Sequence, residues 1–172
     1  MALTEPVGPD DHVQGADDAP LTIVEYGDYQ CSYCGQAYPI IKDLQREYGD
    51  QIRFCFRNFP IPEIHDQALS AAQTAEYAAR GGRFWAAHDA LYEHQDRLGN
   101  DYYTALVGEL GLDESGLSTA LDSDEFIGDI QHDINTGLRS GVNGTPAFFV
   151  NDEFFPGPFT DLPRLVAALV RG

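Results

Sequence analysis

Basic residues are scarce in this chain, and lysine is nearly absent. Its 172 residues include 28 acidic and 10 basic side chains, with Lys42 the single lysine, so the formal net charge at pH 7 is −18. Such a charge repels nucleic acids and anionic membrane surfaces, and neither is expected as a partner. Two origins of the acidity stay open, namely a solvated surface that keeps the protein soluble or adaptation to high salt.

Long hydrophobic runs and a leader-like start are also missing. No run approaches the roughly 18 apolar residues of a membrane span, so no membrane insertion is expected. Residues 1–18 are polar, contain Pro6, Pro9 and four aspartates, and lack the basic start and apolar middle of a signal peptide. The compartment is therefore open between the cytoplasm and an extracytoplasmic site reached through a segment since removed.

Cysteines number only three, Cys31, Cys34 and Cys55. That is too few for a disulfide-rich scaffold, and we expect one domain of ordinary size with its own hydrophobic core. The cysteines are therefore interpreted first by their reactivity. Cys55 lies between Phe54 and Phe56 and is expected to be an inert core thiol.

Hydrophobic periodicity predicts an α/β chain in the order β-α-β, a helical block, then α-β-β-α. Strands are expected at 21–26, 51–57, 147–150 and 153–155. The first helix is expected to follow residue 32 and to end near residue 48. The other expected helices are 65–80, 83–96, 101–110, 115–121, 123–140 and 161–170.

This order divides the chain into three parts. Residues 1–19 are expected to form an extended, loosely packed N-terminal tail, although a short first strand near His12 and Val13 is an alternative. Residues 20–62 and 141–172 are expected to form the core of the domain. Residues 63–140 are expected to be a helical insertion with a connecting helix.

The motif Cys31-Ser-Tyr-Cys34 lies between a predicted strand and a predicted helix. At the start of a helix, unpaired N–H groups and the helix dipole favour a thiolate at Cys31. Cys34 lies one turn later, close enough to form the disulfide, and is expected to resolve a mixed disulfide on Cys31. Half of a zinc site and a purely structural pair are the alternatives, but no second pair or spaced histidines supply further ligands, so no metal is expected.

Two other positions are candidates for the same site. Pro146 follows Thr145 at the start of an aromatic run, so Thr145–Pro146 is a candidate cis peptide beside the cysteines, with an ordinary trans proline as the alternative. The backbone of Thr145 would then be able to pair with an extended substrate. Glu25 lies in a strand that looks buried, where its carboxylate can take up a proton from Cys34, unless it is simply exposed.

Together these features resemble the DsbA-like branch of the thioredoxin superfamily. They are similar also to the thioredoxin-like domain at the C-terminus of some bacterial sodium/proton antiporters of the NhaA type. The resemblance implies a thioredoxin fold (βαβ…αββα) with an all-helical insertion between its halves. It implies a cofactor-free disulfide oxidoreductase, with Cys31 as nucleophile, Cys34 as resolving thiol and Thr145–Pro146 as the cis-proline loop.

The same resemblance suggests an extracytoplasmic protein whose partners are protein or peptide thiols and disulfides, with a redox partner protein that resets the cysteine pair. A monomer is expected. Ser32 and Tyr33, which should touch the substrate, depart from the branch, where proline followed by His, Tyr or Phe is common. Without that histidine, Cys31 should be a less acidic thiol, with a reduction potential in the range of roughly −120 to −270 mV.

Two other function classes stay open at this point. One is a redox-inert thioredoxin-like binding or sensor domain associated with a transporter. The other is conjugation chemistry on small thiols, as in the kappa-class glutathione transferases, which usually lack a complete Cys-x-x-Cys. Both intact cysteines argue against these alternatives.

Overall fold

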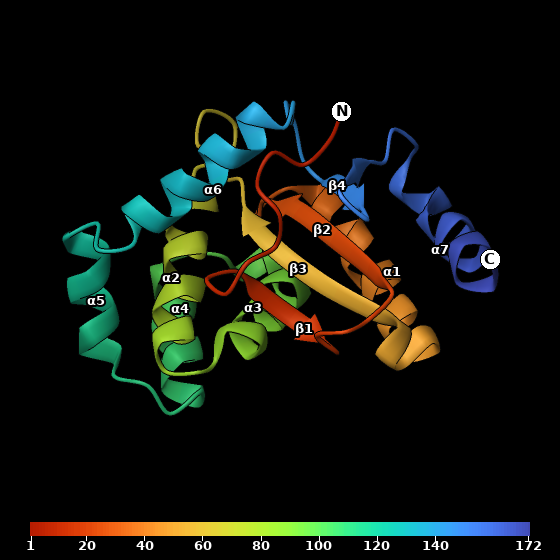
Figure 1. Cartoon of the computed structure of the whole chain (residues 1–172). Helices are drawn as coiled ribbons and strands as arrows, with labels where there is room; N and C mark the ends of the chain where they lie inside the picture. Colours follow the sequence, from red (N-terminus) through yellow and green to blue (C-terminus); the bar gives the residue numbers. More distant parts are fainter.

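The computed structural model describes all 172 residues and contains one five-stranded sheet in the order β1-β3-β2-β4-β5 (Figure 1). The central strand β2 (Leu21–Gly27) runs parallel to β3 (Ile52–Asn58) and antiparallel to β4 (Ala147–Val150). The edge strands β1 (His12–Gly15) and β5 (Glu153–Phe154) are each antiparallel to their neighbour. The predicted thioredoxin fold is confirmed, with β1 as an additional edge strand.

Helices cover the sheet and extend beyond one of its sides (Figure 1). Helix α1 (Ser32–Tyr48) connects β2 to β3, and α7 (Leu162–Arg171) closes the chain. The helical insertion follows β3 and consists of α2 (Ala68–Arg80), α3 (Phe84–Glu93), α4 (Asn100–Glu109) and α5 (Glu114–Asp122). Helix α6 (Ile127–Arg139) then leads back to β4.

Three helix boundaries differ by three or more residues from the predicted ones. The helix expected at 65–80 begins at Ala68. The helix expected at 83–96 ends at Glu93, and a separate short 3₁₀ turn, η2 (Gln95–Arg97), follows it. The helix expected at 123–140 begins at Ile127, because Asp124 has a φ of 52° and interrupts the helical backbone.

Strand β2 contributes side chains to two separate cores, one on each face of the sheet. Leu21 and Ile23 pack in the larger core beneath α1 and α7, whereas Val24 and Tyr26 pack in the smaller core on the other face. Side chains alternate along a strand, so Glu25 shares the face of Leu21 and Ile23. The carboxylate is thereby directed to the side of the sheet that α1 covers.

The N-terminal segment is held firmly, and the expectation of a loosely packed tail is wrong. Its β1 pairs with β3, with Val13 opposite Cys55. Arg57 on β3 is only 2% exposed, and its guanidinium donates to the carboxylate of Asp11 at 2.8 and 2.9 Å and to the carbonyl of Glu5 at 3.0 Å. A buried guanidinium needs acceptors for its N–H groups, and this segment supplies them.

We expect Arg57→Met to lower the free energy of unfolding by about 3 kcal/mol or more, because Asp11 is left as an unpaired, largely buried charge. Urea denaturation measures the loss, and limited proteolysis shows whether the N-terminal segment detaches. Arg53→Met is the matched control on the same strand, since Arg53 donates only to the hydroxyl of Thr22 at 3.3 and 3.4 Å. Equal destabilisation by the two substitutions would contradict the role assigned to Arg57.

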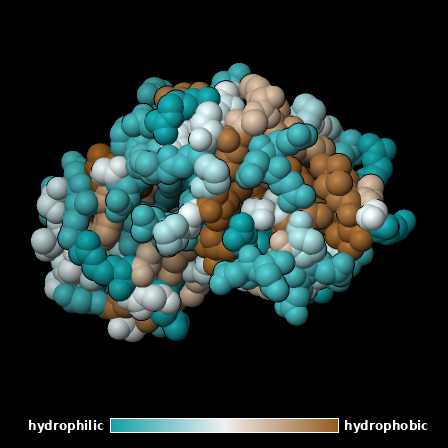
Figure 2. Space-filling model, viewed as in Figure 1, coloured by the Kyte–Doolittle hydropathy of each residue, from teal (hydrophilic) through white to brown (hydrophobic).

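Hydrophilic residues cover most of the face in Figure 2, and hydrophobic residues gather mainly over the sheet. The large hydrophobic side chains that stay exposed are spread along the chain: Met1, Tyr33, Ile64, Leu138 and Leu169. None of the helices is both long and apolar enough to cross a membrane.

Candidate active site

Cys31 is the N-cap residue of α1, in an extended backbone conformation with φ −66° and ψ 123°. A turn positions it, in which its own N–H donates to the carbonyl of Asp28 at 3.1 Å. The first N–H groups of a helix have no partner within the helix, and here those of Tyr33 and Cys34 are directed at the Cys31 sulfur. Local backbone geometry therefore favours a negative charge on this sulfur.

Cys34 lies in the first turn of the same helix but on its inner side. Its side chain is completely buried in the larger core, whereas Cys31 keeps 6% of its surface exposed. Both are free thiols. Of the two sulfurs, the one at the helix N-terminus is therefore the one that a second protein can reach.

The two thiols differ in acidity in opposite directions. Hydrogen bonding from the Cys34 thiol, followed by contacts with Thr145 and with the N–H groups of Cys34 and Tyr33, outweighs desolvation and lowers the pKa of Cys31 to about 5. Burial, the hydrogen bond to Cys31 and the nearby Glu25 raise the pKa of Cys34. At neutral pH this arrangement makes Cys31 the thiolate and Cys34 the protonated thiol.

Glu25 lies beneath the pair and is only 2% exposed. Desolvation, and secondarily the charge on Cys31, raise the pKa of its carboxyl to about 8. Its Oε1 has no hydrogen-bond partner in the protein. Glu25 also borders a small hollow of about 10 Å³ whose other walls include Lys42 and Gln45. A buried carboxyl without a partner costs stability, so its presence calls for a functional reason.

The loop before β4 lies beside Cys31, although 114 residues separate them in sequence. In its thiol form, the Cys31 sulfur donates to the carbonyl of Thr145 at 3.5 Å, and the Thr145–Pro146 peptide bond is cis. Ser32 and Tyr33 are exposed at the start of the helix, with Tyr33 61% exposed. Ser32, Tyr33 and Thr145–Pro146 thus lie next to Cys31, whereas Cys34 and Glu25 are buried behind it.

Asp28 organises this region, a role that was not predicted from the sequence. The carboxylate is buried and accepts from the N–H groups of Gln30 at 2.8 Å and Ile61 at 3.0 Å, while the ring of His65 lies 2.8 Å away. These contacts join the turn before Cys31 to the loop after β3. Aspartate shortly after a strand often forms a turn in which its side chain accepts from the N–H two residues later. Asp28 follows the predicted strand 21–26 in this way, and this pattern was the signal available in the sequence.

His88 and Cys55 are both buried. His88 on α3 is 3% exposed, and its Nδ1 lies 2.9 Å from the hydroxyl of Tyr29. Burial lowers the pKa of His88, which therefore stays neutral. Cys55 is completely buried in the smaller core, on the opposite face of the sheet from Cys34, and burial raises its pKa. Neither group belongs to the cysteine pair.

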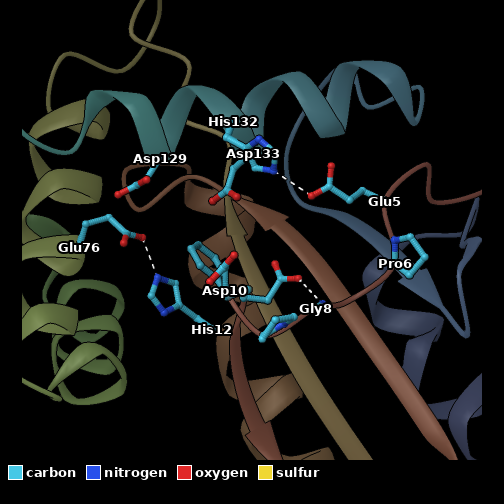
Figure 3. A pocket seen from close by; sticks show the side chains of 12 residues that line it. Glu5, Pro6, Gly8, Asp10, His12, Glu76, Asp129, His132 and Asp133 are labelled. Atoms are coloured by element: carbon cyan, nitrogen blue, oxygen red, sulfur yellow. Dashed lines mark hydrogen bonds and ion pairs between the residues drawn. The ribbon is translucent and has the colours of Figure 1, made fainter.

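A separate hollow of about 530 Å³ lies between the N-terminal segment, α2 and α6 (Figure 3). Acidic side chains and two histidines dominate its lining, and the histidines are paired: His12 with Glu76 and His132 with Glu5, each at 2.8 Å. Burial raises the pKa of Asp133, which also lines it, to about 7. None of the three cysteines lines this hollow.

Comparison with known proteins gives a family and a set of longer relatives. A family model described as Thioredoxin matches residues 8–166. Sodium/proton antiporter NhaA 3 of Salinispora tropica is 40% identical over 98% of this chain and 26% of that protein. NhaA of Herminiimonas arsenicoxydans is 36% identical over 92% of this chain and 25% of that protein. The chain thus spans about a quarter of the length of these curated relatives.

Several solved structures share the fold. BdbD from Bacillus subtilis, in its oxidised form, superposes with a TM-score of 0.83 at 23% identity and covers 94% of each chain. A thioredoxin-like oxidoreductase from Silicibacter pomeroyi has a TM-score of 0.81 at 27% identity, over 96% of this chain and 95% of that one. A periplasmic thioredoxin-like protein from Salmonella enterica has a TM-score of 0.72 at 26% identity, over 96% and 92%.

Proposed function

Because this chain belongs to the thioredoxin family, we propose that it is a DsbA-like thiol–disulfide oxidoreductase that acts on protein thiols through Cys31 and Cys34. The observation that carries the proposal is the asymmetry of the pair. One sulfur is at a helix N-terminus, partly accessible and favoured as a thiolate, and the other is buried and favoured as a thiol. Such a pair can accept an external sulfur at one position only and then resolve the intermediate internally.

The proposed exchange is balanced in sulfur, electrons and protons. In the oxidised protein, a substrate thiolate attacks the Cys31 sulfur, the Cys31–Cys34 bond breaks, and Cys34 leaves as a thiolate. A second substrate thiolate attacks the substrate sulfur of this mixed disulfide and expels Cys31 as a thiolate. The substrate has then lost two electrons to the cysteine pair, and the Cys34 sulfur has gained a proton. Reduction of a substrate disulfide follows the same steps in reverse.

Glu25 is proposed as the group that gives this proton to Cys34 and takes it back in the reverse direction. Its carboxyl is buried below the pair, and its pKa of about 8 lies near neutral pH, where both protonation states are accessible. The small hollow beside it opens toward the polar side chains of Lys42 and Gln45, which gives a short route for proton exchange with solvent.

Substrate contact is proposed for Ser32, Tyr33, Thr145 and Pro146. The first two directly follow Cys31 and are exposed, and the carbonyl of Thr145 lies 3.5 Å from the Cys31 sulfur. An extended peptide that brings its cysteine to Cys31 would pass this loop with its backbone within reach of Thr145. We expect a monomer with one such site, and a second redox protein that resets the pair after each turnover.

We expect a reduction potential in the range of roughly −120 to −270 mV, the interval between DsbA and thioredoxin. The pKa of about 5 for Cys31 lies between the thiols of those two proteins, at about 3.5 and 7. A more acidic thiol stabilises the reduced form and makes the disulfide more oxidising. Equilibration against glutathione buffers measures the potential, and a value outside the interval would contradict this expectation.

Two activity assays test the proposed function. The oxidised protein should restore activity to reduced, unfolded ribonuclease, or the reduced protein should reduce insulin, and the faster reaction gives the direction of electron flow. Cys55→Ala is the matched control, since this thiol lies on the other face of the sheet and its loss should leave exchange intact. Absence of both activities in the folded wild-type protein would reject the proposal.

A second candidate is a redox-inert binding or sensor domain that works beside a transporter. It is favoured by one observation: curated relatives over 92–98% of this chain are named as sodium/proton antiporters and are about four times as long. The two candidates are separated by the same assays. For a sensor without exchange chemistry, replacement of Cys31 would leave the results of both assays unchanged.

A further inference from the structure

Several groups outside the thioredoxin core hold the turn that presents Cys31, and one of them, the side chain of Gln95, bonds to the backbone of Cys31 itself. Gln95 lies in η2, directly after α3 of the helical insertion. Its Nε2 donates two hydrogen bonds, to the carbonyl of Tyr29 at 2.8 Å and to the carbonyl of Cys31 at 2.9 Å. One amide group therefore connects the two backbone carbonyls on either side of Gln30.

Gln95 is the donor to the first of these carbonyls and the second donor to the other. No backbone N–H in the chain donates to the carbonyl of Tyr29, so Gln95 is its donor. The carbonyl of Cys31 accepts from the N–H of Gly35 at 3.0 Å, the bond that begins α1, and Gln95 takes its second lone pair. Gln95 thus completes the hydrogen bonding of the turn just where the helix starts.

Gly35 is fitted to this arrangement. A Cβ added at Gly35 would overlap the side-chain amide of Gln95. The absence of a side chain at this position lets Gln95 approach the helix backbone closely. The first residue after the Cys-x-x-Cys motif and the glutamine of the insertion therefore depend on each other.

Another contact fixes the same turn from the helical insertion. The hydroxyl of Tyr29 lies 2.9 Å from Nδ1 of the buried His88 on α3, and the Tyr29 ring packs against those of Phe56 and Tyr92. Tyr29 is thus held at its ring by α3 and at its carbonyl by η2. The N–H of Gln67 also donates to the side chain of Gln30, but Gln95 is the residue of the insertion that bonds to the cysteine residue itself.

We propose that Gln95 is a positioning residue for the Cys31–Cys34 pair, through which the helical insertion fixes the turn that carries the reactive sulfur. This inference rests on the proposed function for its catalytic meaning, though not for its test. Gln95 donates hydrogen bonds to backbone carbonyls and none to the reacting sulfur.

The physical consequence concerns the charge on the Cys31 sulfur. The N–H groups of Tyr33 and Cys34 stabilise the thiolate only while the start of α1 keeps its orientation. The amide of Gln95 also directs its positive end at two carbonyl oxygens, which offsets part of their unfavourable field at the sulfur. Loss of the two hydrogen bonds should weaken both effects and make the thiolate less favourable.

Gln95→Met tests the proposal, because methionine keeps the length and volume of the side chain and donates no hydrogen bonds. We expect the acid dissociation constant of the Cys31 thiol to fall by about tenfold, a rise of about one pKa unit. The equilibrium with glutathione should move by a similar factor toward the disulfide, because the reduced form loses stabilisation. Thiolate absorbance at 240 nm and the pH dependence of iodoacetamide alkylation measure the titration.

Gly35→Ala should shift the Cys31 titration in the same direction by displacing Gln95, and the double variant should shift it no further than Gln95→Met alone. Gln131→Met is the matched control, since Gln131 is exposed on α6 and donates only to Asn135. Urea midpoints separate loss of stability from loss of positioning. An unchanged Cys31 titration in Gln95→Met would overturn the proposal, even in a destabilised variant.

The titration needs no substrate, so the two hypotheses can fail separately. If the wild-type protein exchanges no disulfides, the proposed function is wrong while the Cys31 titration still decides the role of Gln95. If exchange is rapid and the Cys31 titration of Gln95→Met equals that of the wild type, the proposed function stands and the positioning role is rejected.

Discussion

Replacing Cys31 by serine is expected to slow disulfide exchange by more than about 1,000-fold, because a hydroxyl is not ionised near neutral pH and forms no disulfide. Cys31 is the sulfur that keeps some exposure, and it lies where α1 favours a negative charge. The buried Cys34 cannot take over its role without opening the core. Initial rates of insulin reduction and of ribonuclease reactivation measure the loss.

Replacing Cys34 by serine should have a different effect, which identifies the order of the two thiols. The first attack at Cys31 is preserved, but the internal thiol that resolves the mixed disulfide is gone, so adducts with a single-cysteine peptide or glutathione should accumulate on Cys31. Intact-protein mass spectrometry detects them. Adducts on Cys34 in the Cys31→Ser variant, at a rate near that of the wild type, would reverse the assigned roles.

Both comparisons require that the variants fold. Cys31 borders the larger core and keeps 6% of its surface exposed, whereas Cys34 is completely buried, so serine at position 34 brings a hydroxyl into an apolar site and should reduce stability more. Circular dichroism and urea midpoints establish the folded fraction before rates are compared. Cys55→Ala, which removes a buried thiol remote from the pair, controls for the general cost of losing a core cysteine.

Glu25→Gln is the second substitution with a large expected effect, and it should act oppositely on stability and on rate. The pKa of Glu25 rises from an ordinary value of 4.5 to about 8 on folding, so the folded protein binds this proton more tightly than the unfolded chain. The stabilisation from the protonated carboxyl is fully present below pH 4.5 and is lost as the pH rises through 8. When the titration is complete, the loss amounts to roughly 5 kcal/mol, at about 1.4 kcal/mol for each unit of the pKa difference.

A glutamine at position 25 carries no charge at any pH, so this part of the pH dependence should disappear. Urea denaturation between pH 4 and 9 measures it as the difference in slope between variant and wild type. Glu47→Gln is the matched control, since Glu47 is exposed on α1. A variant whose stability follows the wild-type pH profile would show that Glu25 is already ionised in the folded protein at low pH.

The same substitution should slow exchange at neutral pH by about 10- to 100-fold, because Cys34 loses its proton donor and acceptor and relies on solvent. The pH profile of the rate should lose the limb near pH 8 that Glu25 produces. A gain in stability at high pH together with a loss of rate is the pattern of a functional group that is costly to bury. An exchange rate equal to that of the wild type from pH 5 to 9 would reject the proton-transfer role.

The acidic pocket and the cysteine site illustrate why clusters of charge alone do not locate function in this chain. Figure 3 shows a strongly acidic hollow, yet its histidines are already paired with carboxylates and no cysteine lines it. The cysteine site has a different composition. Its chemistry comes from backbone N–H groups, a single buried carboxyl and one peptide loop, which together act on two sulfur atoms.

Local patterns in the sequence identified the strands, the helices and the candidate residues, and the family resemblance that they carry implied the fold. A β-branched run at residues 21–26 and alternation at 51–57 identified the central strands, and helical periodicity identified the helices, because burial of one face repeats at a fixed period. The position of Cys31 at a strand-to-helix junction followed from the same periods. Glu25 was recognisable as a carboxyl in a strand with buried neighbours, and Pro146 as a proline that starts one.

Only the tertiary structure decided which distant groups meet. Gln95 lies 66 residues from Tyr29 and Thr145 lies 114 residues from Cys31, and no local period predicts either contact. The N-terminal segment is held beside β3 because Arg57, buried on that strand, needs acceptors, and Asp11 and Glu5 of this segment supply most of them. His88 lies in the core because α3 packs its ring against Tyr29, whose hydroxyl pairs with it.

The sequence therefore identified the candidate pair, as two cysteines three positions apart after a strand. It did not determine the acidity of the two thiols, because acidity depends on which N–H groups, carbonyls and carboxyls surround a sulfur atom within a few ångströms. Periodicity reports which side of an element is buried. The partner of a given backbone carbonyl depends on how separate helices pack, and that is settled only when the whole chain has folded.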